Sequence, residues 1–123
     1  MTRPLALVYY EKLMPGSQLV NKLQDMNYRV QTSGSAAGFQ SLAQEGKPLL
    51  AIVDLAGGEE VCRAIAALKQ DGSTDHIPVI AFAGEGAARW MESAQRAGAE
   101  VVVTDAAITN HLADMLDRAL NLE

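Results

Sequence analysis

The chain has 123 residues, which is the size of one domain, and its 49% hydrophobic and 20% charged residues exclude wholesale disorder. Its 10 Lys and Arg stand against 15 Asp and Glu, and the resulting net charge of −5 argues against nucleic-acid binding through bulk positive charge.

Short apolar runs alternate along the chain with segments of helical spacing. Residues 5–10 are apolar and rich in β-formers, and residues 28–32 alternate like a more exposed strand. Residues 49–54 are apolar without alternation, which is typical of a strand covered on both faces, and residues 77–82 and 101–104 are the fourth and fifth predicted strands. After each run, hydrophobic residues recur at helical spacing, in these five sets: Leu19, Val20, Leu23 and Met26; Ala36, Phe39, Leu42 and Ala43; Val61, Ile65 and Leu68; Ala87, Met91 and Ala94; Ile108, Leu112, Met115, Leu116 and Ala119.

Five repeats of strand then helix predict an α/β fold with parallel strands and helices on both faces. The first, third and fourth strands are the most apolar and should be central, whereas the second is polar enough for an edge. We therefore predict a five-stranded doubly wound parallel sheet in the order 2-1-3-4-5, with two helices on one face and three on the other. The switch point of such a sheet lies between strands one and three.

The single cysteine, Cys62, excludes an intramolecular disulfide and a cysteine-based zinc site. No apolar run approaches the roughly 18 residues of a membrane span, and the first residues show no signal-peptide pattern. We expect a cytoplasmic protein that forms one domain over residues 1–123 and has no membrane partner.

Ligands bind such sheets at the switch point, beyond the carboxyl ends of the strands. Asp54 closes an otherwise apolar strand. Because an ionised carboxylate is costly in an apolar core, we expect Asp54 to be accessible at this edge of the sheet. Its alternative role is to cap the helix that follows, through the turn at Gly57-Gly58.

Four segments resemble the CheY-like receiver domain of bacterial two-component response regulators. Residues 50–54 are similar to the strand that ends in the phosphoacceptor aspartate, and residues 58–65 to the start of the third helix. Residues 76–81 resemble the fourth strand, and residues 97–100, Ala-Gly-Ala-Glu, match the family's Ala-Gly-Ala-acidic turn. The spacing of the ten elements also agrees, over nearly the whole chain. The resemblance implies a signalling domain in a phosphorelay, with a histidine kinase, an output domain or a second copy as its partner.

The pocket departs from the family pattern. In the family, an acidic pair after strand one holds Mg²⁺, and a hydroxyl after strand four and a lysine after strand five bind the phosphoryl group. Here Tyr10-Glu11, Ala83 and Asp105 stand at those positions, and the loop after Asp54 is shortened. A cation about 4 Å from a phosphoryl oxygen contributes roughly 4 kcal/mol at an effective dielectric near 20, and a carboxylate replaces that attraction by repulsion.

We therefore predict a pseudo-receiver that acts by protein–protein interaction. Asp54 would be phosphoacceptor-like but inefficient, Glu11 and Asp54 would form at most a weak Mg²⁺ site, and no cofactor would be required. One alternative is a functional phosphoacceptor receiver in which Lys12 or Arg89 supplies the missing cation. A second is a flavodoxin-like nucleotide or flavin binder, which the bulky and acidic residues 11–15 disfavour. We expect no enzyme, because no Ser/His/Asp or Cys/His set converges at this edge.

Trp90 lies off the apolar stripe of the fourth helix, so we expect it to be partly exposed. The surface of helix four, strand five and helix five is the usual partner face of receivers, and the resemblance implies the same here. Trp90 is then expected to border a homodimer or partner surface, unless it packs back on the alanines of its own helix. We expect Cys62 to be a small buried hydrophobe and Tyr10 to pack strand one or plug the altered pocket.

Overall fold

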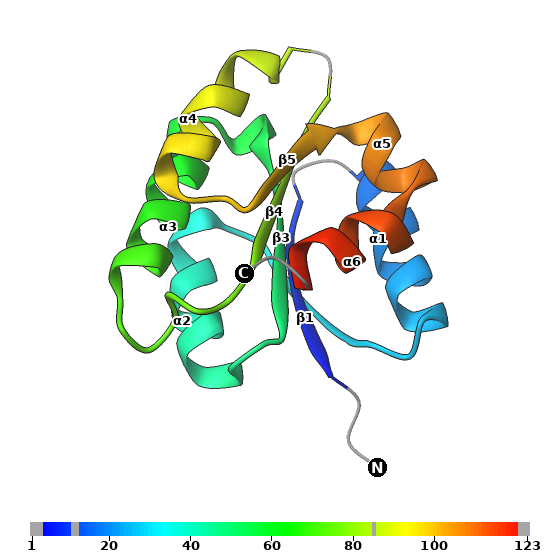
Figure 1. Ribbon diagram of the computed structural model, residues 1–123, viewed down its shortest axis with the longest axis horizontal. Helices are drawn as coiled ribbons and strands as arrows, with labels where there is room; N and C mark the ends of the chain where they lie inside the picture. Colours follow the sequence, from blue (N-terminus) through cyan, green and yellow to red (C-terminus); the bar gives the residue numbers. More distant parts are fainter. Residues whose placement is uncertain (1–3, 11–12, 85, 121–123) are drawn as a thin grey trace.

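A single parallel sheet forms the centre of the molecule (Figure 1). The computed structural model describes residues 4–10, 13–84 and 86–120, except for the side chains of residues 13–16, 36 and 37. Neighbouring strands are all parallel and follow the predicted order β2-β1-β3-β4-β5. The strands are β1 (Leu5–Tyr9), β2 (Arg29–Ser33), β3 (Leu50–Asp54), β4 (Val79–Ala83) and β5 (Val101–Thr104).

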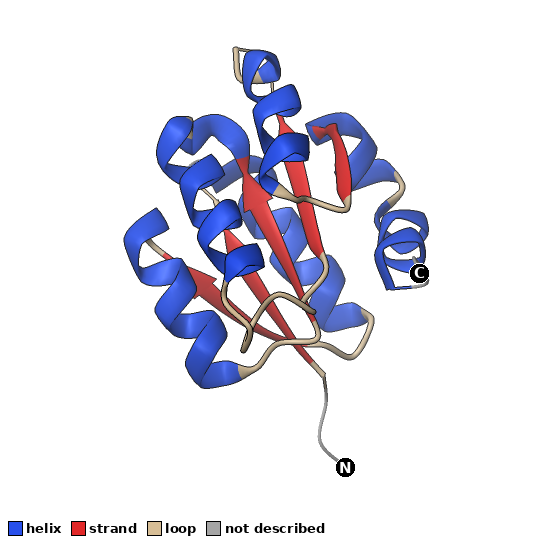
Figure 2. Ribbon diagram, turned by 60° about the vertical axis from the view of Figure 1, so that its left-hand side comes forward, coloured by secondary structure: helices blue, strands red, loops and turns tan. Residues whose placement is uncertain are grey.

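Helices cover both faces of the sheet, with α2, α3 and α4 on one side and α1, α5 and α6 on the other (Figures 1 and 2). The helices are α1 (Leu13–Asp25), α2 (Ala36–Gly46), α3 (Glu59–Gln70), α4 (Met91–Ala97), α5 (Asp105–Asn110) and α6 (Leu112–Leu120), with short 3₁₀ turns η1 (Leu55–Gly57) and η2 (Ala88–Trp90). None of the helices in the described part of the chain has the length and apolar character needed to cross a bilayer.

The predicted last helix is two helices, α5 and α6. The five predicted helices divide over the faces as two and three, as expected, but this break gives three observed helices on each face. Thr104 caps α5 by accepting a hydrogen bond from the backbone N–H of Ala107, so α5 begins directly after β5. His111 then leaves helical geometry, with φ −130° and ψ 35°, and separates α5 from α6. The hydrophobic stripe runs through both helices without marking this break, because Ile108 and Leu112 face the same core.

The two faces of the sheet explain why its central strands lack polar alternation. Every residue of β1, β3 and β4 is buried, whereas the edge strand β2 has two exposed, two partly buried and one buried residue. Successive side chains point to opposite faces. Leu7 and Val53 therefore join the core under α2, α3 and α4, while Val8 and Ile52 join the core under α1, α5 and α6.

A polar cluster joins α3, β4 and the turn before β5 at the edge where the strands begin, which we call the amino edge. The Lys69 ammonium donates to Glu100 Oε2 at 2.6 Å and to the Ile77 carbonyl at 2.6 Å. Glu100 Oε1 accepts a hydrogen bond from the backbone N–H of Val79 at 2.8 Å. Gly98, with φ +117°, makes room for the lysine stem, since a Cβ there would lie 2.8 Å from Lys69 Cγ. The turn at residues 97–100, which resembles the Ala-Gly-Ala-acidic turn of receivers, is thus hydrogen-bonded through Glu100 to the first residue of β4.

Removing the Glu100 carboxylate should destabilise the fold. We expect Glu100→Ala to lower the free energy of unfolding by about 1–3 kcal/mol, because it leaves the Val79 N–H without its acceptor and removes the carboxylate that pairs with Lys69. Glu92→Ala is the matched control, since it removes an exposed helical ion pair with Arg96 and should change stability by less than about 0.5 kcal/mol. Urea unfolding of both variants checks this, and equal losses would contradict it.

Candidate functional site

The strand ends bring three of the predicted site residues to the opposite edge of the sheet, the carboxyl edge. Asp54 ends β3, Ala83 ends β4, and Asp105 opens α5 directly after β5. Ala83 pairs in register with Thr104, which places Asp105 immediately beyond it. The Asp105 carboxylate lies close to the backbone of Gly84, where an added Cβ would stand 3.0 Å from Oδ2. At the carboxyl edge, the Ala83 methyl group therefore lies on β4, the strand beside β3, and the Asp105 carboxylate lies at the end of the next strand, β5.

Asp54 is buried, with only 3% of its surface exposed, so the expectation that it is accessible is wrong. Its Oδ1 accepts a hydrogen bond from the backbone N–H of Ala56 at 2.9 Å and thereby caps η1. The alternative role, capping of the helix that follows, is wrong as stated: Gly58 is the N-cap residue of α3 and α3 has no side-chain cap, whereas Asp54 caps the short turn η1. Leu55, the first residue of η1, is fully buried, so η1 begins in the core next to the Asp54 carboxylate. A backbone N–H offsets the cost of burying the carboxylate.

Two aromatic side chains hold the turn between β3 and α3. A Cβ on Gly57 would lie 2.8 Å from Tyr9 Oη and 2.3 Å from Val61 Cγ2, so only glycine fits there. Gly58 has φ +69° and ψ −139°, a conformation that L side chains rarely adopt. The indole of Trp90 lies 3.4–3.5 Å from where a Cβ on Gly58 would stand. The shortened loop after β3 is thus closely packed between Tyr9 and Trp90.

Trp90 connects this turn to α4. It is half-buried at the end of η2, as its off-stripe position predicted, and it packs against the core under α2, α3 and α4. Its carbonyl lies 4.0 Å from Cys62 Sγ, and the guanidinium carbon of Arg89 lies 5.1 Å from its ring centroid. The geometry of Arg89 on Trp90 is that of a cation–π pair. Arg89, a proposed substitute cation, therefore lies over the indole.

The remaining predicted residues have different outcomes. Glu11 and Lys12 lie outside the described residues, so a Mg²⁺ site at Glu11 and Asp54 stays a prediction. Tyr10 is partly buried and packs against the core under α1, α5 and α6. Among the residues that the structure describes, no group of three His, Cys, Asp or Glu side chains is arranged to hold a metal ion.

Cys62 is buried on α3, as predicted. Burial raises the pKa of its thiol, and the negative charge of Glu59 raises this pKa further. Both effects disfavour the thiolate, which is the reactive form. Cys62 therefore contributes to the fold as a small buried side chain.

Sequence reasoning missed the roles of Tyr9 and of the Trp90–Gly58 contact. The Gly57-Gly58 pair is the sequence feature that could have indicated these contacts. Two adjacent glycines after a buried strand indicate close approach of other groups or unusual backbone angles. The sequence does not show which side chains make that approach.

Comparison with known proteins identifies the fold. No protein-family model matches the chain, and no curated protein matches it. The chemotaxis response regulator CheY4 of Vibrio cholerae superposes with a TM-score of 0.82 at 18% identity, over 97% of this chain and 100% of that one. A response regulator from Thermotoga maritima gives 0.81 at 16% identity, over 98% and 100%. NtrX from Brucella abortus gives 0.81 at 19% identity, over 97% of this chain but 26% of that longer chain. The chain therefore has the CheY-like, flavodoxin-type fold.

A side chain at Gly58 should disturb the turn. We expect Gly58→Ala to lower the free energy of unfolding by about 1–3 kcal/mol, because the backbone conformation is unfavourable for an L side chain, and to shift the Trp90 fluorescence, because the added methyl group contacts the indole. Gly72→Ala is the control, since a Cβ at Gly72 meets nothing within 4 Å. Thermal unfolding and emission spectra check this, and a neutral Gly58→Ala would contradict the described packing.

The Cys62 thiol should react slowly. At pH 8 we expect iodoacetamide to modify the folded protein at least about tenfold more slowly than the unfolded chain, because the raised pKa and burial both reduce accessible thiolate. Glu59→Gln should accelerate the reaction slightly by removing the nearby negative charge. Mass spectrometry against time measures both rates, and equal rates in folded and unfolded protein would contradict this.

Proposed function

We propose that this chain is a receiver-like signalling domain with a degenerate phosphorylation pocket, acting mainly through protein–protein interaction in two-component or related signal transduction. The fold shared with response regulators supports the first part. The burial of Asp54 under its own capped turn supports the second, because a phosphoacceptor must present its carboxylate to the phosphodonor.

Access is the first obstacle to phosphoryl transfer. To reach a donor, the Asp54 carboxylate would have to release the Ala56 N–H and displace the turn at Gly57 and Gly58. That turn packs between Tyr9 and Trp90. Opening it therefore costs hydrogen bonding and packing together.

Charge is the second obstacle. The fold's phosphate-binding positions hold Ala83 and Asp105, which offer neither a hydroxyl nor a cation. Glu59 and Glu60 occupy the first turn of α3, directly after the loop. These charges make the local potential more negative, and a phosphoryl group on Asp54 would lack the cationic compensation that phosphoryl transfer requires.

The partner surface proposed for this domain is the face of α4, β5 and α5. Trp90 and Arg89 are residue types that recur at interaction hot spots, and here they stack on each other beside α4. The contact of Trp90 with Gly58 links this face to the closed turn. A histidine kinase or an output domain is the kind of partner that this face would bind.

Wild-type protein should not accept a phosphoryl group. With acetyl phosphate and Mg²⁺ we expect no mass increase, and with beryllofluoride and Mg²⁺ almost no change in Trp90 fluorescence or in amide NMR shifts. Stoichiometric modification that disappears in Asp54→Asn would overturn the proposal and establish a functional phosphoacceptor.

A charge substitution separates the two obstacles. Asp105→Lys restores the cation but leaves the turn closed, so it should improve beryllofluoride binding only slightly. Asp75→Lys, with the same charge change on an exposed residue, is the control. Strong binding by Asp105→Lys would show that the missing lysine alone disables the site.

A further inference from the structure

Exposed large hydrophobic side chains gather at the amino edge, away from Asp54. In the described part of the chain, these are Met26, Leu49 and Leu120, which are 37%, 44% and 37% exposed. All three line one or other of two pockets that share Leu120. Apolar side chains clustered in this way mark an interaction surface more often than isolated ones do.

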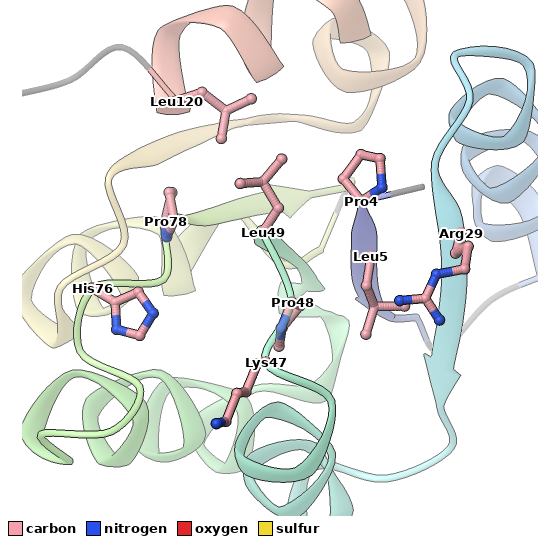
Figure 3. Close-up of a pocket in the computed structure, with 9 residues that line it drawn as sticks. All are labelled: Pro4, Leu5, Arg29, Lys47, Pro48, Leu49, His76, Pro78 and Leu120. Carbon is pink, nitrogen blue, oxygen red and sulfur yellow. The ribbon is translucent and has the colours of Figure 1, made fainter. Parts of the chain in front are cut away.

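The first pocket, of about 570 Å³, lies where the strands begin (Figure 3). Leu5 opens β1, and Leu49 and Pro78 directly precede β3 and β4. Leu120, the last residue of α6, lines the pocket as well, and Figure 3 shows its side chain pointing toward Leu49. The exposed side chains of Lys47 and His76 stand beside this apolar lining.

The second pocket, of about 410 Å³, lies between α6 and the segment that joins α1 to β2. Met26, Leu116 and Leu120 supply apolar lining, and the exposed Asp114 supplies a carboxylate. Because Leu120 belongs to both pockets, they form one surface. We call this surface, with both pockets, the amino-edge face.

The two halves of the amino-edge face differ in charge. The first pocket includes the cationic side chains of Arg29 and Lys47, together with His76, whereas the second includes Asp114 and Asp117. Arg29 and Asp117 also have interactions within their own chain, so the contacts between copies are assigned to Lys47 and Asp114.

We propose that the amino-edge face binds a second copy of this chain in a two-fold symmetric dimer. A two-fold axis near Leu120 places the basic half of one copy on the acidic half of the other, and it does so twice. The same operation buries Leu49, Leu120 and Met26 of both copies. An interface with a small apolar centre and polar surroundings is expected to give a dissociation constant on the order of 100 µM.

This dimer is independent of the proposed signalling function. The amino-edge face lies at the opposite end of the strands from Asp54 and from the Gly58 turn that Trp90 covers. It leaves the face of α4, β5 and α5 for a different partner. Failure of one proposal would therefore leave the other standing.

Sedimentation equilibrium over a wide concentration range tests the apolar contact. Wild type should show a monomer–dimer equilibrium, and Leu49→Ser and Leu120→Ser should each weaken it at least about tenfold. Trp90→Ala should leave it unchanged. Circular dichroism and unfolding curves establish that each variant is folded. A wild type that stays monomeric throughout, or a dimer lost in Trp90→Ala but kept in Leu120→Ser, would overturn the proposal.

Charge reversal tests the symmetry. Lys47→Glu alone and Asp114→Lys alone should each weaken self-association, because each places like charges together at both ends of the interface. Mixing the two variants should restore dimers as heterodimers, since both contacts then pair opposite charges.

The control mixture is Arg63→Glu with Glu92→Lys, which makes the same net charge changes on exposed residues of α3 and α4. Native mass spectrometry separates heterodimers from homodimers. The control variants keep the proposed interface intact, so their mixture should give homodimers and heterodimers in statistical proportion, whereas the first mixture should give heterodimers almost exclusively. Statistical proportions in both mixtures, or no heterodimers in the first, would overturn the proposal.

Discussion

The hydrogen bond from the Ala56 N–H to Asp54 determines what the carboxyl edge can do. It makes burial of this carboxylate tolerable at the end of an apolar strand, and it begins the short turn that leads to α3. Because Gly57 and Gly58 follow at once, Tyr9 and Trp90 can pack directly against that turn. The edge that binds ligands in doubly wound sheets is here occupied by the protein's own backbone and aromatic side chains.

The two ends of the sheet therefore differ in character. The carboxyl edge is closed around Asp54, with Asp105 beside Gly84. At the amino edge, the ion pair between Lys69 and Glu100 connects α3 to the turn before β5. The same edge carries two pockets with apolar linings, one with cationic and one with anionic side chains. This difference supports the proposal that the domain acts by binding proteins rather than by phosphoryl transfer.

The architecture could be predicted from the sequence because it depends on local patterns. Apolar runs without alternation mark the central strands, and the structure buries every residue of those strands. The burial of Asp54 and the break at His111 could not be predicted in this way. Both depend on which side chains meet across the sheet, and a hydrophobic stripe or a strand-terminal carboxylate looks the same in either outcome.

Hydrogen exchange at the Ala56 amide, followed by NMR, tests the central claim most directly. If Asp54 holds this N–H in a buried turn, the amide should exchange slowly, and Mg²⁺ with beryllofluoride should not change its rate. An amide that exchanges as freely as one in an open loop, or that loses its protection when the phosphoryl mimic is added, would contradict the account. The first result would mean that the turn is open in solution, and the second that Asp54 is available for phosphorylation.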